Sequence, residues 1–165
     1  MDIKKIQDAL SRNEFDGWLL YDFHDMNHIA LGMLDLPDEI MQTRRFFYFV
    51  PADGSPQKLV HRIEDKHLDH LPGEKTIYLS WQSLEEGLRH ILKGATKIAM
   101  EYSPRNAIPY VSRVDAGIVE LINSLNKEVV SSANLIQEFE SCLTDEQIET
   151  HHTAAKQVRQ FVLNA

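Results

Sequence analysis

The sequence predicts an α/β domain built on a mixed sheet of about six strands, with helices on both faces of the sheet. Stretches with apolar residues at helical spacing alternate with short apolar or aromatic runs that are typical of strands. Two of these runs flank a segment rich in turn-forming residues, 51–56, which predicts an antiparallel hairpin. The 165 residues fit one domain, and a chain of this length buries about two-thirds of its unfolded surface without disulfides or metals.

Composition and charge restrict the class of function. Apolar residues make up 43% of the chain and charged residues 25%, as in ordinary globular proteins. The formal charge of −8 argues against nucleic acid or an anionic membrane as partner, because both require a basic surface. Cys142 is the single cysteine, so no internal disulfide forms. The charged start of the chain has no hydrophobic segment after it, and we therefore expect a reducing, cytoplasmic setting.

The first part of the chain predicts a helix, a central strand and a polar loop. Ile3, Ile6 and Leu10 recur at helical spacing, and a turn follows at 13–17. Residues 18–21 form a strand that is apolar on both faces and is therefore expected in the middle of the sheet. The polar loop that follows leads into a short helix, which we expect to end at Gly32. Residues 33–43 have no clear period and are expected to form a loop.

The middle of the chain predicts three strands and two helices. Strands at 45–50 and 57–61 form the hairpin. A helix is expected over 62–71, ended by Pro and Gly, and a further strand over 76–80. Apolar residues at helical spacing across 84–92 predict the next helix, with Gly94 as its stop.

The stretch from Lys97 to Ile122 predicts a strand, a polar loop and an amphipathic helix. A short apolar run at 98–100 reads as a buried strand that ends at Glu101. Ser112 is expected to cap the helix, with Asp115 reaching back to a free backbone N–H. In an α/β sheet, the loop at the carboxyl end of such a strand usually holds the ligand.

The last part of the chain predicts a short strand and two helices. Val129 and Val130 lie in the strand, and Ser132 is expected to cap the helix that follows. Thr144 and Gln147 form a capping box for the final helix, which carries no stop signal before the chain ends. The simplest interpretation is one domain at residues 1–143, with 144–165 as the start of a linker helix that leads to a domain absent from this chain.

The chain carries no recognised catalytic or metal-binding motif. Three pairs have metal-ligand spacing: His24 and His28, His67 and His70, and Glu149 and His152. The first pair lacks the Glu of a zinc-protease helix, and the last lacks the second motif and the two further Glu residues of a di-iron site. Solvated or structural roles are favoured for all three. Cys142 has an apolar flank without a basic neighbour, so a buried, inert thiol is expected. We therefore expect no catalytic residue, metal ligand or cofactor within this chain.

Two polar loops are the candidate binding site. They follow the first strand, at 22–28, and the fifth strand, at 101–113. If these strands are parallel neighbours, six side chains converge on one edge of the sheet, where binding sites form: Asp22, His24, Asn27, Glu101, Asn106 and Arg113. The alternative is that these residues cap helices and satisfy loop backbone groups. Arg44 and Arg45 are interpreted either as guanidinium groups that bind a carboxylate or as solvated charges. Trp81 is interpreted either as a core residue or as an aromatic side chain that lines a partner's pocket.

The order of short segments along the chain resembles that of a known family. The segments are an N-terminal helix, DGWLLYD at 16–22, an Asn-x-x-x-x-Gly element at 27–32, PADGSPQKLV at 51–60, AMEYSP at 99–104 and TDEQIETHHTAAK at 144–156. Together they resemble the N-terminal domain of the creatinase and prolidase family, which includes Xaa-Pro aminopeptidases and Xaa-Pro dipeptidases. The resemblance covers essentially all 165 residues.

The resemblance implies a non-catalytic domain with a ribonuclease H-like strand arrangement, placed ahead of a pita-bread catalytic domain. In that family two divalent metal ions, commonly manganese, cobalt or zinc, are held by two Asp, one His and two Glu and activate a water for peptide hydrolysis. None of those ligands maps onto this sequence. The resemblance therefore implies a metallopeptidase parent that acts on peptides, a fragment that is inactive alone, and the parent's own catalytic domain as a partner.

The resemblance also implies assembly as a homodimer or tetramer, with loop residues of this domain at the rim of an active site. Asp22, Arg45 and Trp81 match that rim by loop position. The chain reads IALG at 29–32 where relatives often read YLTG, and it reads SCLT at 141–144 where many carry Lys. These departures leave the parent open between a proline-specific peptidase, a creatinase-like amidinohydrolase and a divergent hydrolase. The alternatives are a stand-alone module that binds a small molecule or peptide, and a pure oligomerisation domain.

Overall fold

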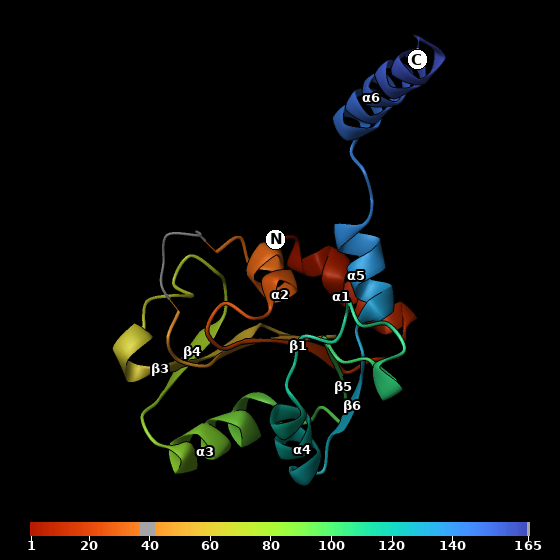
Figure 1. Ribbon diagram of the computed structural model, residues 1–165. Helices are drawn as coiled ribbons and strands as arrows, with labels where there is room; N and C mark the ends of the chain where they lie inside the picture. Colours follow the sequence, from red (N-terminus) through yellow and green to blue (C-terminus); the bar gives the residue numbers. More distant parts are fainter. Residues whose placement is uncertain (37–41, 165) are drawn as a thin grey trace.

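The computed structural model describes residues 1–36 and 42–164 and contains a six-stranded sheet (Figure 1). The spatial order is β4-β3-β2-β1-β5-β6. In chain order the strands are β1 (Gly17–Asp22), β2 (Phe46–Pro51), β3 (Gln57–His61), β4 (Glu74–Tyr78), β5 (Lys97–Met100) and β6 (Glu128–Ser131). Strand β2 pairs antiparallel with both β1 and β3, and the remaining pairs are parallel. The mixed sheet, the hairpin and the central position of β1 are confirmed.

Helices cover both faces of the sheet, as predicted (Figure 1). One face packs against α1 (Ile3–Arg12), α2 (His28–Met33) and α5 (Ala133–Glu140). The other face packs against α3 (Trp81–Ile91) and α4 (Ala116–Ser124). The last helix, α6 (Asp145–Asn164), extends away from this body. Residues 1–36 and 42–164 also contain two short 3-10 turns, η1 (Arg62–Glu64) and η2 (Pro104–Asn106).

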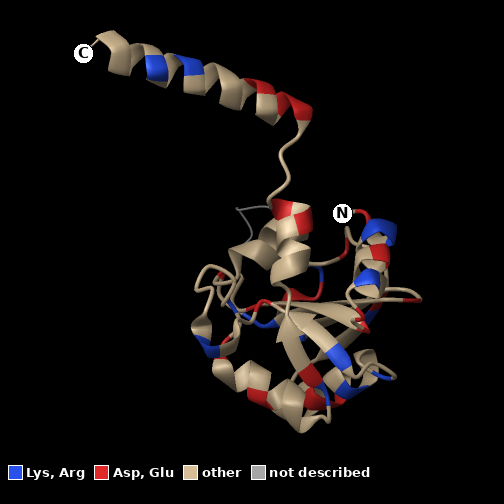
Figure 2. Ribbon diagram, turned by 90° about the vertical axis from the view of Figure 1, so that its right-hand side faces the viewer, with Lys and Arg blue, Asp and Glu red and all other residues tan. Residues whose placement is uncertain are grey.

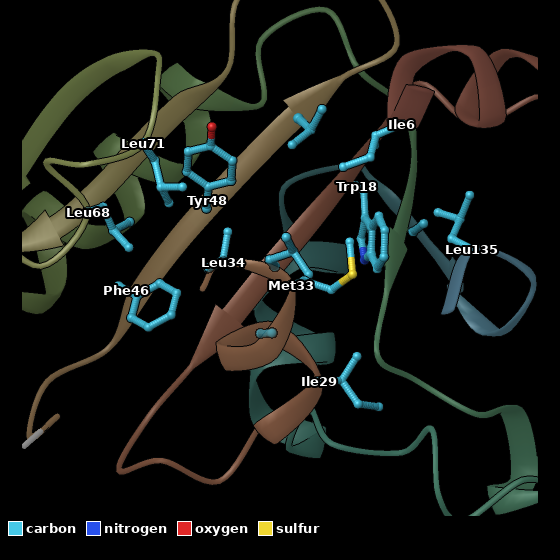
Figure 3. Close-up of a cluster of buried hydrophobic side chains, with 14 of the residues drawn as sticks. Ile6, Trp18, Ile29, Met33, Leu34, Phe46, Tyr48, Leu68, Leu71 and Leu135 are labelled. Carbon is cyan, nitrogen blue, oxygen red and sulfur yellow. The ribbon is translucent and has the colours of Figure 1, made fainter. Parts of the chain in front are cut away.

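Two hydrophobic clusters hold these layers together, and β1 contributes to both. Successive side chains of a strand point to opposite faces, so Trp18 and Leu20 enter one cluster while Leu19 and Tyr21 enter the other. Figure 3 shows the first cluster, in which Trp18 lies among residues from the sheet and from α1, α2 and α5. Strand β2 does the same with Phe46, Tyr48 and Val50 on one face and Phe47 and Phe49 on the other. Full burial of each large apolar side chain contributes about 1.5–3 kcal/mol, so these two central strands contribute much of the burial that stabilises the fold.

The predicted helix over 62–71 is wrong apart from its first turn. After η1 the chain continues as turns up to residue 70, with a bend at residue 71. The buried Nζ of Lys58 donates to the carbonyl oxygens of Leu68 and Leu71, at 3.1 and 2.6 Å. The carboxylate of Glu64 accepts the backbone N–H groups of Thr43 and Arg44. These long-range bonds hold the segment in turns, because they place its polar groups against neighbouring segments rather than along a helix axis.

Several predicted ends of elements are also corrected. The strand expected at 76–80 is β4, which ends at Tyr78, because Ser80 is the N-cap of α3 and forms a capping box with Ser83. Trp81 is therefore the first residue of α3 rather than a loop residue. Gly32 lies inside α2, which continues to Met33. Part of the loop expected at 33–43 falls at residues 37–41, outside the described residues.

The caps predicted by Ser112 and Ser132 are wrong, whereas the capping box of α6 is confirmed. Asp115 is the N-cap of α4, and its carboxylate accepts the N–H of Ile118 at 3.0 Å. Ser132 occupies the N-cap position of α5, but its hydroxyl donates to Glu101 instead of accepting from the helix. Thr144 and Gln147 exchange side chain to backbone hydrogen bonds at the start of α6.

The C-terminal segment differs from the body in its exposure. All the side chains described in α6 are exposed, with acidic residues at its start and basic residues further along (Figure 2). Cys142 lies in the link before α6 and is exposed, which corrects the expected buried thiol, because no core residue packs over that link. Among the described helices, none combines the length and apolar character needed to cross a membrane. The domain boundary after residue 143 stays a prediction.

Candidate functional site

A pocket of about 910 Å³ opens at the edge of the sheet where β1, β3 and β4 end, and we call it the carboxyl-edge pocket. Its walls come from four segments that are distant in sequence. These are the end of β1 with the turn after it (21–27), the residues before β2 (43–45), the β4–α3 junction (78–81), and the segment 112–118 that leads into α4. His61 at the end of β3 and Leu121 of α4 complete the lining.

The topology explains why a hollow forms at this edge. Strands β1 and β5 are parallel neighbours, with Gly17 beside Ile98 and Trp18 beside Ala99, which is the condition on which convergence of the two polar loops depended. After β1 the chain passes to α2 on one face of the sheet, and after β5 it passes to α4 on the other face. Connections that diverge from adjacent parallel strands leave a crevice between them, which is the usual ligand position in an open α/β sheet.

Three arginines supply positive charge to the pocket: Arg44, Arg45 and Arg113. The hydroxyl of Tyr78 donates to the backbone oxygen of Arg45 at 2.7 Å, and Nε of Arg113 donates to the backbone oxygen of Tyr110 at 3.0 Å. Within residues 1–36 and 42–164, no carboxylate lies within 4.0 Å of any of the three guanidinium groups. Burial raises the pKa of the Tyr21 and Tyr78 phenols, and the charge of Arg45 opposes both shifts.

Two carboxylates share the pocket, but both are engaged by neighbouring groups. Asp22 is buried and accepts the backbone N–H groups of Asp25 and Asn27, at 3.0 and 2.7 Å. Burial raises the pKa of Asp22, and these hydrogen bonds oppose the rise. Asp115 accepts the hydroxyl of Tyr21 at 3.0 Å and also caps α4. With three arginines against these two carboxylates, the described lining has an excess of positive charge.

An apolar wall lies beside these charges. Four large side chains of the lining are exposed: Phe23 at 39%, Met26 at 62%, Leu79 at 69% and Trp81 at 64%. A group of exposed apolar side chains next to arginines is typical of surfaces that bind ligands or partners, because water is readily displaced from such surfaces.

Behind the pocket lies a buried polar group that we call the Glu101 cluster, consisting of Glu101, Trp18, Asn27 and Ser132. The Glu101 carboxylate is fully buried and accepts Nε1 of Trp18 at 2.6 Å, Nδ2 of Asn27 at 2.8 Å and Oγ of Ser132 at 3.1 Å. Burial raises the pKa of Glu101, and the three donors oppose that shift. The cluster ties β1 and the end of β5 to the starts of α2 and α5.

The structure brings together the three residues predicted for an active-site rim. Asp22, Arg45 and Trp81 all line the carboxyl-edge pocket, although they lie in three separate segments of the chain. The arrangement follows from the antiparallel direction of β2, which brings the residues before β2 to the edge where β1 and β4 end. Their role at a rim stays a prediction.

The five residues predicted for a loop binding site fall in three places. Asn27 and Arg113 line the pocket, and Glu101 lies in the cluster behind it, bonded to Asn27. His24 and Asn106 are exposed and lie outside the lining. Both have positive φ, 57° and 54°, as in turns that reverse the chain. The binding role of these five residues stays a prediction.

The pocket also contains residues that sequence reasoning missed. Phe23, Met26, Tyr78 and Leu79 were not among the predicted site residues, yet all four line the pocket, and all except the buried Tyr78 belong to the apolar wall. Leu79 carried a usable signal, because a large apolar residue between a strand end and a helix N-cap has no core to enter. Among the described residues, no three His, Cys, Asp or Glu side chains are grouped so as to hold a metal ion.

No family model matches the sequence, and no curated protein matches it. Several solved structures, in contrast, are similar to this chain over most of its length. A dipeptidase from Pyrococcus horikoshii OT3 is similar with a TM-score of 0.66 and 19% identity, covering 100% of this chain and 44% of that chain. A prolidase from the same organism has a TM-score of 0.60 and 15% identity, covering 98% and 41%. The creatinase/prolidase N-terminal domain of an X-Pro dipeptidase from Streptococcus pyogenes has a TM-score of 0.59 and 15% identity, covering 83% and 97%.

These similarities show the fold. The chain has the fold of the creatinase/prolidase N-terminal domain, as the ordered segments predicted. It matches nearly the whole of an isolated N-terminal domain, but it spans only 41% and 44% of the two longer enzymes.

Proposed function

We propose that this chain is the non-catalytic N-terminal domain of a metal-dependent Xaa-Pro dipeptidase or aminopeptidase. The observation that carries the proposal is the shared fold over nearly all of the chain with structures described as prolidase and X-Pro dipeptidase. In this proposal the parent hydrolyses peptides with two divalent ions, manganese, cobalt or zinc. The ions are held by a catalytic domain that follows this one, where they activate the attacking water.

The domain's own contribution is to shape substrate access. Its carboxyl-edge pocket supports this role, because Asp22, Arg45 and Trp81 gather there and Trp81 is exposed rather than packed into the core. A large, partly apolar side chain at an open edge is suited to contact a substrate or the rim of a neighbouring active site.

The second contribution is assembly with the catalytic domain and with a second subunit. Helix α6 supports it, because Val158, Phe161 and Val162 are all exposed and have the i, i+3, i+4 spacing that places residues on one side of a helix. An apolar stripe of this kind is stabilised when another surface covers it.

The test compares the 165-residue chain with the same chain extended past Ala165. Both are assayed with added manganese for hydrolysis of an Xaa-Pro dipeptide and of a longer peptide with Xaa-Pro at its start. We expect activity in the extended chain alone, and the preferred peptide length separates a dipeptidase from an aminopeptidase. Activity in neither form overturns the proposal, and hydrolysis of creatine by the extended chain would identify an amidinohydrolase parent instead.

The pocket favours one second candidate, a stand-alone module that binds a small molecule or peptide. It predicts that the chain performs its function without a catalytic domain. The two candidates separate in the extended chain, because Trp81→Ala lowers peptidase activity only if the pocket serves an attached active site. The variant must keep the assembly state of the parent for this comparison to hold.

A further inference from the structure

The carboxyl-edge pocket has a local charge opposite to that of the whole chain. The chain carries a formal charge of −8, yet the pocket is lined by three arginines and by two carboxylates whose oxygens already accept internal hydrogen bonds. A basic hollow on an acidic protein selects for an anion that makes close contacts, because the long-range field repels negative ligands. Planar guanidinium groups match the two oxygens of a carboxylate.

The start of α3 adds to this preference. Ser80 and Trp81 line the pocket, so the amino end of an 11-residue helix faces it. The first turn of α3 contains no acidic residue, and the partial positive charge of the helix end is therefore not neutralised from within. The helix end and the arginines act in the same direction.

The size and the apolar wall indicate what the anion is attached to. A volume of about 910 Å³ lies within the range of small-molecule sites and is far larger than a simple ion needs. Phe23, Leu79 and Trp81 present apolar surface that an inorganic anion would leave in water. The occupant that satisfies both parts is a small organic molecule with one carboxylate and apolar groups.

We propose that the carboxyl-edge pocket binds the free C-terminal carboxylate of a short apolar peptide, held by Arg45 and Arg113, with Trp81 and Leu79 against its side chains. The inference rests on the proposed function, because that function supplies peptides as the relevant carboxylates. It places a peptide-binding site within this domain.

The test is a fluorescence titration of the 165-residue chain without added metal. The two tryptophans differ in exposure, since Trp18 is fully buried and Trp81 is 64% exposed, so a ligand in the pocket changes the emission of Trp81. The probes are Leu-Pro with a free carboxylate and Leu-Pro amide. We expect saturable binding of the acid and binding of the amide that is weaker by about tenfold or more, because charge-assisted hydrogen bonds are lost.

Variants define the residues involved. Combined Arg45→Ala and Arg113→Ala should weaken binding of Leu-Pro by at least about tenfold. Arg45→Lys alone keeps the charge but loses the fork and should weaken binding less. Arg159→Ala removes the same charge from the exposed helix α6 and should bind as the unaltered chain does. Circular dichroism spectra that match the unaltered chain ensure that the comparison is made between folded proteins.

Two results overturn the inference. One is equal binding of acid and amide, and the other is displacement of Leu-Pro by an equal concentration of inorganic phosphate, which would indicate a simple anion site. Hydrolysis by the extended chain together with no binding by the 165-residue chain removes this inference and leaves the proposed function intact. Binding of Leu-Pro by the 165-residue chain, together with no hydrolysis by the extended chain, supports the binding site and overturns the proposed function.

Discussion

Two polar regions lie at the same edge of the sheet and differ in how their charges are satisfied. In the Glu101 cluster a buried carboxylate receives three donors from the protein. In the carboxyl-edge pocket Arg45 and Arg113 have no carboxylate partner among the described residues, and apolar side chains beside them stay exposed. The difference teaches that polar residues after neighbouring strands serve either the fold or a ligand. A polar group whose hydrogen bonds or charge are matched by other protein groups serves the fold, whereas a group without such partners is available to a ligand.

The largest effect is expected for Glu101→Leu. The substitution leaves Nε1 of Trp18 buried without an acceptor and frees the donors of Asn27 and Ser132 from their shared partner. Loss of the central acceptor of a buried network destabilises by about 3 kcal/mol. Urea unfolding measures the change in the free energy of unfolding. A loss below about 1 kcal/mol would mean that the cluster does not hold the fold, and the contrast with the pocket would disappear.

Asn27→Ala should have the next largest effect, about 2 kcal/mol in the free energy of unfolding. Asn27 caps α2 by accepting the N–H of Ala30, and it donates to the oxygen of Tyr21 and to Glu101. Asn27→Ser is the matched control, because serine retains a cap for α2 but loses the bond to Glu101. In urea unfolding, Asn27→Ser should therefore lose less free energy of unfolding than Asn27→Ala. A variant Asn27→Ser as stable as the unaltered chain would show that only the cap of α2 matters.

The pH dependence of stability tests the same cluster without changing its packing. Burial raises the pKa of Glu101 above its ordinary value of 4.5, so above pH 4.5 the folded state binds more protons at this site than the unfolded state. Stability from this group is full below pH 4.5 and is lost as the pH rises through the folded-state pKa. Glu64, whose pKa is lowered by hydrogen bonds that outweigh its burial, acts with the opposite sign below pH 4.5.

Urea unfolding at several pH values from 4.5 upward measures this dependence. In Glu101→Gln the decline above pH 4.5 should be smaller than in the unaltered chain, because the group that titrates is gone. Asp22, whose pKa burial also raises, contributes a remaining decline of the same sign. An unchanged slope in Glu101→Gln would mean that Glu101 stays ionised in the fold over this range.

Much of the fold could be predicted from local patterns, because the determinants are local. Strand β1 is apolar on both faces, and the turn residues at 51–56 specify the hairpin. The segment 62–71 could not be predicted, because its turns depend on Lys58 and on contacts of Glu64 with residues about 20 positions earlier. The local sequence, with Pro72 and Gly73 as the expected end of a helix, does not record such bonds, so the helix expected there was wrong.

The position of the site could be predicted, but the sequence did not show which polar residues line the pocket and which are buried in the Glu101 cluster. Strand ends and the family resemblance located Asp22, Arg45 and Trp81, which the pocket brings together. Glu101 has the same kind of position at a strand end, yet its partners Trp18 and Ser132 lie 83 and 31 residues away. Burial of that carboxylate depends on how α5 packs over the sheet edge, and no short segment of sequence encodes that packing.

The smallest effect is expected for combined Arg45→Ala and Arg113→Ala, which should change the free energy of unfolding by less than about 0.5 kcal/mol. Arg45 is held through its backbone oxygen by Tyr78, and alanine retains that oxygen. Removing the Arg45 charge further raises the pKa of Tyr21 and Tyr78, but both phenols stay neutral at pH 7 in either case. Arg113 loses only the bond from Nε to the exposed Tyr110 backbone. A loss above about 2 kcal/mol in urea unfolding would place these arginines with the Glu101 cluster, as groups that hold the fold. A near-zero change combined with lost peptide binding would place them with the ligand.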